Sequence, residues 1–224
     1  MFILLLKDEL CGIRTTKLFY YLIFGFPLAL LFVSIMSTLS GGESGLPFMM
    51  MLVANMVFVF IVPIITSGLI SDINNGAVSL FVARGVSRTT ILSARWLAYF
   101  SVFTLVLSLS LLLSWVVSSV IMGQKPHEGS IPLLGTMLTF IIAESGISVS
   151  MGIVCGVTIS TITTGVLLSF ILSIQVGNGL LYCLDVLKKN MDISMVVSIT
   201  LAVGFVVSLL IFYVSVVIFK RKSL

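Results

Sequence analysis

The sequence has very little charge, and this excludes a water-soluble globular protein. Of its 224 residues only 9% are charged and 59% are hydrophobic, whereas soluble domains carry about 25% charged residues. Too few charged groups remain to cover a water-facing surface, so we expect an integral membrane protein. The net charge of +4 does not indicate a nucleic-acid partner, because the basic residues lie at the ends of apolar runs, where membrane orientation explains them.

The residues that enzymatic and metal sites require are also scarce. The single histidine, His127, lies in a polar loop, and the three cysteines have no CxxC spacing. Glu144 is the only carboxylate within the apolar runs, so the carboxylate pair of an intramembrane aspartyl site is missing. No GxxxxGK[ST] sequence is present to hold a nucleotide phosphate. The sequence therefore predicts no catalytic residue, no metal site and no bound cofactor.

Long apolar runs are what the chain does have. A membrane-crossing helix needs about 20 predominantly apolar residues. The run at 131–184 is too long for one helix, so we expect a helical hairpin that turns near 156–165. The six predicted spans cover residues 18–39, 46–70, 96–122, 131–155, 165–184 and 195–219. The sequence thus predicts an all-α integral membrane protein with a single transmembrane domain over residues 1–224.

The distribution of basic residues predicts the orientation of these spans. Lysine and arginine concentrate on the cytoplasmic side of membrane proteins. With both termini in the cytoplasm of a plasma-membrane protein, only Lys125, Lys188 and Lys189 lie outside. The predicted cytoplasmic set is Lys7, Arg14, Lys17, Arg84, Arg88, Arg95, Lys220, Arg221 and Lys222.

The N-terminal segment, residues 1–17, differs from the predicted spans because apolar and charged residues alternate in it. At helical spacing Phe2, Leu5, Glu9 and Ile13 share one side. We interpret the segment as a helix that lies in the cytoplasmic membrane interface. The alternative is a frayed end that carries a few charges before the first span.

The most polar connector between two predicted spans is residues 72–95, DINNGAVSLFVARGVSRTTILSAR, with one acid and three arginines. The Asn-Asn-Gly turn at 74–76 and Gly85 bound a predicted amphipathic helix over 77–83. Ser87 can cap a second helix that leads into the third span.

We expect this short helix to lie across the cytoplasmic membrane face. In that position it would present Phe81 and Arg84 to a soluble partner. The alternative is a solvated basic loop that only sets the membrane topology.

A few polar residues lie within the predicted spans. An ionisable group at membrane depth is costly and faces the protein interior or water. Glu144 could contact a substrate, act as a proton-linked switch or clamp two helices, or it could be a protonated side chain hydrogen-bonded to a serine, Gln175 or Asn178. The candidate translocation residues are Glu144, Asn55, Gln175 and Asn178. Ser145, Gly146, Ser148, Ser150 and Gly152 predict close helix packing around the same span.

The N-terminal segment and the connector together resemble the permease subunits of type-2 ABC exporters, the ABC-2 family. Those permeases have an interfacial helix with a Lys-acid-Leu pattern and a following Arg, six spans and both ends inside. Their connector runs acid, Gly-small, apolar helix, Pro-Val-Ser-Arg, apolar pair and Lys. The corresponding residues here are Lys7, Glu9, Leu10, Arg14, Asp72, Gly76, Ala77, Leu80, Phe81, Val86, Ser87, Arg88, Ile91, Leu92 and Arg95, with Gly85 in place of the usual proline.

The resemblance implies that the helix at 77–83 is a coupling helix, which docks in a cleft of a separate ABC ATPase subunit. The docking residues that it implies are Gly76, Leu80, Phe81, Arg84, Ser87 and Arg88. ATP would be bound by that partner and not by this chain. One six-span chain is half of a translocation unit, so a second permease subunit, identical or different, is also implied, and export is the expected direction.

Two other functions stay open at this point. Ala83-Arg84-Gly85 and Ala94-Arg95 are similar to the Ala-Arg-Gly motifs of membrane coupling subunits in vitamin-uptake transporters, which place them in a larger cytoplasmic helical region. A non-transporting membrane scaffold or assembly factor belongs to a different class. An ATPase encoded beside this chain would favour a transporter over a scaffold.

Overall fold

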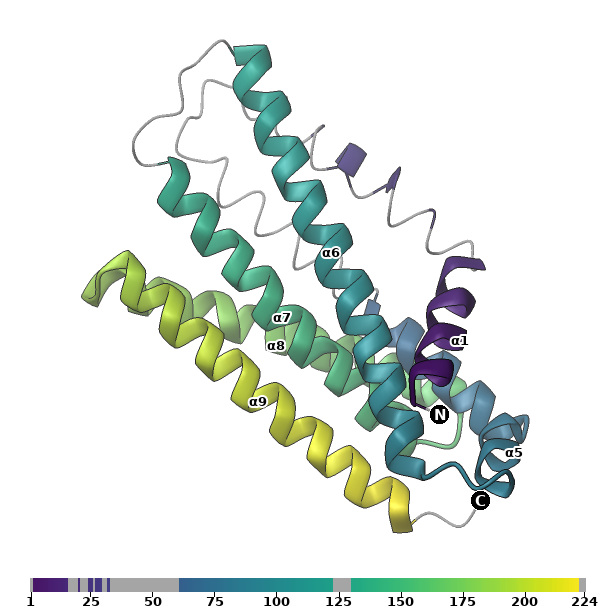
Figure 1. Ribbon diagram of the computed structural model, residues 1–224. Coiled ribbons are helices and arrows are strands. Elements are labelled where there is room, and N and C mark those ends of the chain that lie inside the picture. Colours follow the sequence, from purple (N-terminus) through teal and green to yellow (C-terminus); the bar gives the residue numbers. More distant parts are fainter. Residues whose placement is uncertain are drawn as a thin grey trace.

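The computed structural model describes residues 2–15, 61–122 and 130–221, together with residues 20, 24, 25, 27–29 and 32. Apart from the short connections between helices this part of the chain is helical, and the described residues contain no strand. The helices are α1 (Phe2–Thr15), the helix Ile61–Asn74, α5 (Ala77–Ala83), α6 (Arg88–Met122), α7 (Ser130–Thr158), α8 (Ile162–Asn190) and α9 (Ile193–Arg221) (Figure 1).

Four of these helices, α6 to α9, are long and apolar enough to cross a membrane. The predicted spans at 96–122, 131–155, 165–184 and 195–219 each lie within one of them. The predicted span at 18–39 lies outside the described residues apart from a few positions. The described part of the span at 46–70 belongs to the helix Ile61–Asn74.

The hairpin predicted near 156–165 is present as a tight connection between two antiparallel helices. Helix α7 ends at Thr158 and α8 begins at Ile162. The hydroxyl of Thr158 donates to its own helix at the carbonyl of Val154, 2.8 Å away, and Thr161 precedes α8 with an extended backbone. Hydroxyl and β-branched residues thus occupy the turn, as the composition of this stretch indicates.

Helix α7 is the central helix of the described bundle. In the 18-residue apolar window within Leu134–Thr158, 83% of the residues are buried, against 28%, 22% and 17% in the corresponding windows of α6, α8 and α9. Its glycines let the helix Ile61–Asn74 approach closely. A Cβ added at Gly152 would lie 3.0 Å from Cβ of Ile65, and one added at Gly156 would lie 2.9 Å from Cβ of Leu69.

Helix α9 packs on another face of α7, and here too the contact depends on a small residue. A Cβ added at Gly204 would lie 2.4 Å from Cβ of Ala143. Further along, the hydroxyls of Ser150 and Ser208 are hydrogen-bonded at 2.9 Å. From the Ala143–Gly204 contact to the Ser150–Ser208 contact the residue numbers increase in both helices, so α7 and α9 run parallel.

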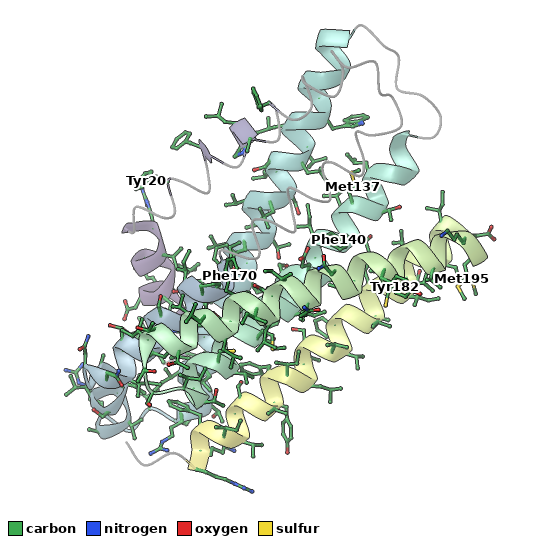
Figure 2. All side chains as sticks on the ribbon, turned by 180° about the vertical axis from the view of Figure 1, so that it is seen from behind. Tyr20, Met137, Phe140, Phe170, Tyr182 and Met195 are labelled. Atoms are coloured by element: carbon green, nitrogen blue, oxygen red, sulfur yellow. The ribbon has the colours of Figure 1, made fainter. Side chains whose placement is uncertain are left out.

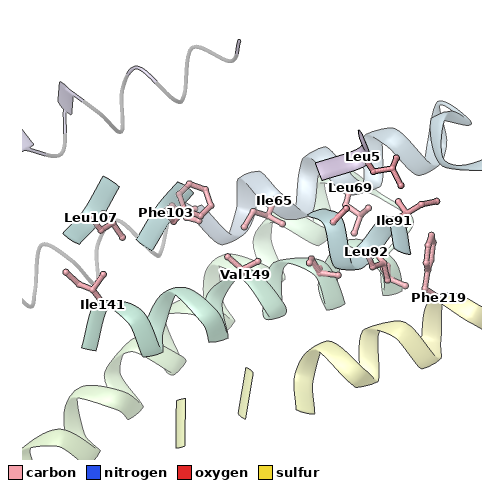
Figure 3. Packing of buried hydrophobic residues seen from close by; sticks show 14 of the residues in the cluster. Leu5, Ile65, Leu69, Ile91, Leu92, Phe103, Leu107, Ile141, Val149 and Phe219 are labelled. Carbon is pink, nitrogen blue, oxygen red and sulfur yellow. The ribbon is translucent and has the colours of Figure 1, made fainter. Parts of the chain in front are cut away.

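A continuous hydrophobic core joins α1, the helix Ile61–Asn74, α6 and α7 (Figure 3). It includes Leu5 of α1 and Leu69 of the helix Ile61–Asn74. Leu92 and Phe103 of α6 and Val149 of α7 belong to the same core. Phe219, near the end of α9, is fully buried at the same end of the bundle as Leu92. The apolar residues therefore connect the short N-terminal helix to the long helices in one packed unit.

Large apolar side chains are also exposed on the outer helices. Figure 2 shows the side of the bundle formed by α8 and α9, where Phe170, Tyr182 and Met195 are 39%, 72% and 56% exposed. An apolar surface of this extent marks contact with a membrane or with another protein.

Candidate functional site

The short helix α5 is bounded by two glycines in the left-handed region of backbone space. Gly76 has φ 74° and Gly85 has φ 82°, a conformation that glycine adopts without the steric cost of a Cβ. At the end of α5, the N–H of Val86 donates to the carbonyl of Phe81 at 3.1 Å and that of Gly85 to Val82 at 2.9 Å. This pair of bonds is a Schellman motif, which ends the helix sharply.

The two faces of α5 have different surroundings. Val78 is buried and Phe81 packs against the core, whereas Leu80 is 63% exposed and Arg84 is exposed. The sequence prediction paired Phe81 with Arg84 on the outward face. In the structure Phe81 lies inward, because positions 78 and 81 share a helical face and line a small cavity of about 30 Å³ together with Leu5 of α1.

A buried guanidinium connects the two helices on either side of α5 to the N-terminal helix. Arg95 of α6 is only 9% exposed. Its Nε donates to Oε1 of Glu9 at 2.9 Å, and its Nη2 donates to Oδ2 of Asp72 at 2.6 Å. We call Arg95, Glu9 and Asp72 the Arg95 clasp. It joins α1, the end of the helix Ile61–Asn74 and the first turns of α6 by charge-assisted hydrogen bonds, which are stronger than neutral ones.

Sequence reasoning identified the acid at Asp72 and the base at Arg95, but it did not pair them with Glu9. The signal was present in α1, where Leu5, Glu9 and Ile13 fall four residues apart. In the structure Leu5 and Ile13 are buried on this face, so a carboxylate between them is favoured by a cationic partner.

The start of α6 is fixed by two further interactions. The N–H of Thr90 donates to Oγ of Ser87 at 3.2 Å, which is the N-terminal cap that the sequence predicts at Ser87. Nη1 of Arg88 donates to the carbonyl oxygens of Phe219 at 3.0 Å and of Lys220 at 3.3 Å. A cation at the end of a helix is favoured by the helix dipole, so Arg88 holds the end of α9 and does not belong to the outward surface of α5.

The connection between α7 and α8 lies at the same end of the bundle. Nδ2 of Asn74 donates to the carbonyl oxygen of Ser160 at 3.1 Å. Figure 1 shows α1, α5, the start of α6 and the end of α9 gathered at this end. The candidate docking residues Leu80 and Arg84 therefore lie on a surface to which several described helices contribute.

Of the four polar residues proposed for the spans, the three that the structure describes are not hydrogen-bonded to one another. Glu144 is fully buried, and neither of its carboxylate oxygens has a hydrogen-bond partner among the described residues. Gln175 and Asn178 are exposed on α8 and do not hydrogen-bond with Glu144. Asn55 lies outside the described residues.

Polar contacts inside the bundle are instead made by a hydroxyl network. Nε1 of Trp96 donates to Oγ of Ser150 at 2.8 Å, and Ser150 is hydrogen-bonded to Ser208. Nearby, Thr104 and Ser145 share a hydrogen bond of 2.8 Å. The network joins α6, α7 and α9. The sequence indicates the serines of α7, but not their partners in the other two helices.

The described ranges contain no cluster of three or more His, Cys, Asp or Glu side chains that could hold a metal ion. In comparisons with known proteins, no family model matches the chain and no curated protein matches it.

Proposed function

We propose that this chain is the transmembrane permease subunit of an ABC transporter, driven by a separate ATPase subunit that docks on α5. One observation carries the proposal: α5 exposes Leu80 and Arg84, while its other face is fixed to the bundle. A docking element for a mechanical partner needs both properties. It must be accessible, and it must transmit displacement without yielding.

The attachments of α5 support such transmission. It follows the helix Ile61–Asn74 after one turn and precedes α6 after another, so a displacement of α5 acts directly on both of these helices. The Arg95 clasp also attaches α1 to α6 and to the helix Ile61–Asn74. Because packed cores are rigid, a partner that closes on ATP could shift these helices together.

The same proposal places the chain in the plasma membrane with six spans and both termini in the cytoplasm. The four long apolar helices support the membrane location. The gathering of Arg84, Arg88, Lys220 and Arg221 at one end agrees with a cytoplasmic position of that end. In this arrangement α1 is the interfacial helix and α5 is the coupling helix.

The proposal assigns the remaining parts of the transporter to partners. ATP binds to the ATPase subunit, since the sequence carries no phosphate-binding loop. A second permease subunit completes the substrate path, and the resemblance of the 72–95 connector to type-2 exporters favours export. Docking involves Leu80 and Arg84 directly, and Gly76, Phe81, Ser87 and Arg88 by holding α5 and α6 in place.

Affinity purification of the tagged full chain from its native membranes tests this proposal. We expect an ATP-hydrolysing subunit to co-purify, and Leu80→Glu or Arg84→Glu to reduce its recovery about tenfold or more, since an interface hot spot contributes at least 2 kcal/mol. Arg221→Glu is the matched control, because Arg221 is exposed at the same end but lies on α9. Purification without any ATPase would favour a scaffold and contradict the proposal.

A further inference from the structure

A hydrophobic groove lies between α6, α7 and α9, separate from the α5 surface. Its volume is about 270 Å³. Small side chains and aromatic rings line it, among them Ala143, Gly146, Gly204, Phe100 and Phe205. Phe205 is 57% exposed, so the groove opens onto the outer surface of the bundle.

The groove offers nothing that would hold a polar ligand. Its only polar side-chain groups are the indole N–H of Trp96 and the hydroxyl of Ser208. Both are already hydrogen-bonded to Ser150, at 2.8 Å and 2.9 Å. An occupant must therefore be hydrocarbon, because a polar group in this space would lose its water without gaining a partner.

The dimensions of the groove limit the shape of that occupant. Along α9 it extends from Leu201 to Ser208, which is about 10 Å at 1.5 Å per residue. A segment of one hydrocarbon chain can lie along this length of α9.

The surroundings of the groove point to the same occupant. The outward positions of α9 beside it are apolar, with Val206, Leu209 and Leu210 at 55%, 44% and 60% exposure. These side chains form a surface that a bilayer would cover. A lipid tail lying along α9 can therefore enter the groove without crossing a polar barrier.

We propose that the groove between α6, α7 and α9 is a binding site for one acyl chain of a membrane lipid. This inference rests on the proposed membrane location, but it does not depend on the ATPase partner. The bound acyl chain lies in the groove between the three helices.

Photolabelling tests the proposal. The full chain is reconstituted in phospholipid nanodiscs that contain a trace of phosphatidylcholine with a diazirine in one acyl chain, and the labelled positions are mapped by mass spectrometry after irradiation and removal of bulk lipid with detergent. We expect label on Phe100, Ile142 and Phe205. We expect Ala202→Phe, which fills the groove from α9, to lower the label on Phe100 and Ile142 about tenfold, equivalent to about 1.4 kcal/mol of binding.

Val203→Phe is the matched control, because Val203 is also exposed on α9 but does not line the groove. It should leave the label on Phe100 unchanged. Label on Leu209 and Leu210 without label in the groove would overturn the acyl-chain site while supporting the membrane location. Cross-linking of Phe100 to a second copy of the chain would overturn it in favour of a protein contact. Absence of label from every apolar face would contradict the membrane location itself.

Discussion

Arg95 and Asp72 are 23 residues apart in the sequence, yet Nη2 of Arg95 donates to Oδ2 of Asp72 at 2.6 Å. The same guanidinium reaches Glu9 in the N-terminal helix. The two ends of the 72–95 connector are thus closed on one another, and α5 is held between them. This closure leaves α5 with one face against the bundle and one face exposed.

The Arg95 clasp should contribute measurably to stability. We expect Arg95→Met to lower the free energy of unfolding by about 2 kcal/mol, since hydrogen bonds to charged groups contribute about 1.5–3 kcal/mol. The loss is moderate because Glu9 and Asp72 are 20% and 39% exposed and can be hydrated when Arg95 is absent. Thermal unfolding in detergent measures it. Arg84→Met should have no effect on unfolding, and an equally stable Arg95→Met protein would show that the clasp does not hold α1.

The hydroxyl network provides a second test, inside the bundle. Ser150 accepts from Trp96 and is bonded to Ser208, so Ser150→Ala should cost about 1 kcal/mol, as interhelical hydrogen bonds in membrane proteins contribute about 0.6 kcal/mol each. Ser198→Ala is the control, because Ser198 is exposed and donates only to Ser194 of its own helix. Equal unfolding temperatures for the two variants would contradict a role of the network in joining the helices.

Glu144 is expected to behave in the opposite way. Its carboxylate oxygens are buried and have no partner among the described residues, so Glu144→Gln removes an ionisable group without breaking a hydrogen bond seen in this part of the chain. We expect the variant to be as stable as the parent, or more stable by about 1 kcal/mol. Glu9→Gln, which weakens the bond to Arg95, should be destabilised in the same assay. A larger loss for Glu144→Gln than for Glu9→Gln would mean that Glu144 has a partner.

The position of the α7–α8 connection allows a test of topology. Asn74 donates to Ser160, so Asn75→Cys and Ser160→Cys, introduced into a cysteine-free chain, should react with a membrane-impermeant maleimide from the same face of the membrane. Asp192→Cys, in the connection between α8 and α9, should react from the opposite face. Reaction of positions 75 and 160 from different faces would exclude the proposed arrangement of spans.

Local features of this chain could be predicted from the sequence because each depends on a few neighbouring residues. The extent of α5 follows from the glycines at 76 and 85, and the start of α6 follows from the cap at Ser87. The turn between α7 and α8 follows from the length of the apolar run and its hydroxyl residues. None of these features requires knowledge of what lies beside them in space.

The contacts that build the candidate site could not be predicted in this way. Glu9 and Arg95 are 86 residues apart, and Arg88 and Phe219 are 131 residues apart, so no local pattern links them. The sequence predicts Phe81 on the outward face of α5, but in the structure it lies inward and Leu80 is exposed. The cause is related, because periodicity gives the two faces of α5, whereas the position of Leu5 in α1 decides which of them is buried. The apolar pattern also predicts that the fifth span ends at residue 184. In the structure α8 continues through charged residues to Asn190.

The proposed function requires a nucleotide-hydrolysing subunit that contacts the exposed face of α5. The most direct test places a photo-crosslinking amino acid at position 80 of the full chain in its native membranes, with position 105 as the control, since Leu105 is equally exposed but lies within the apolar stretch of α6. We predict a covalent adduct of position 80 with a protein that binds and hydrolyses ATP, and no such adduct at position 105. An adduct with a protein that does not bind nucleotide, or no protein adduct at position 80, would contradict the account.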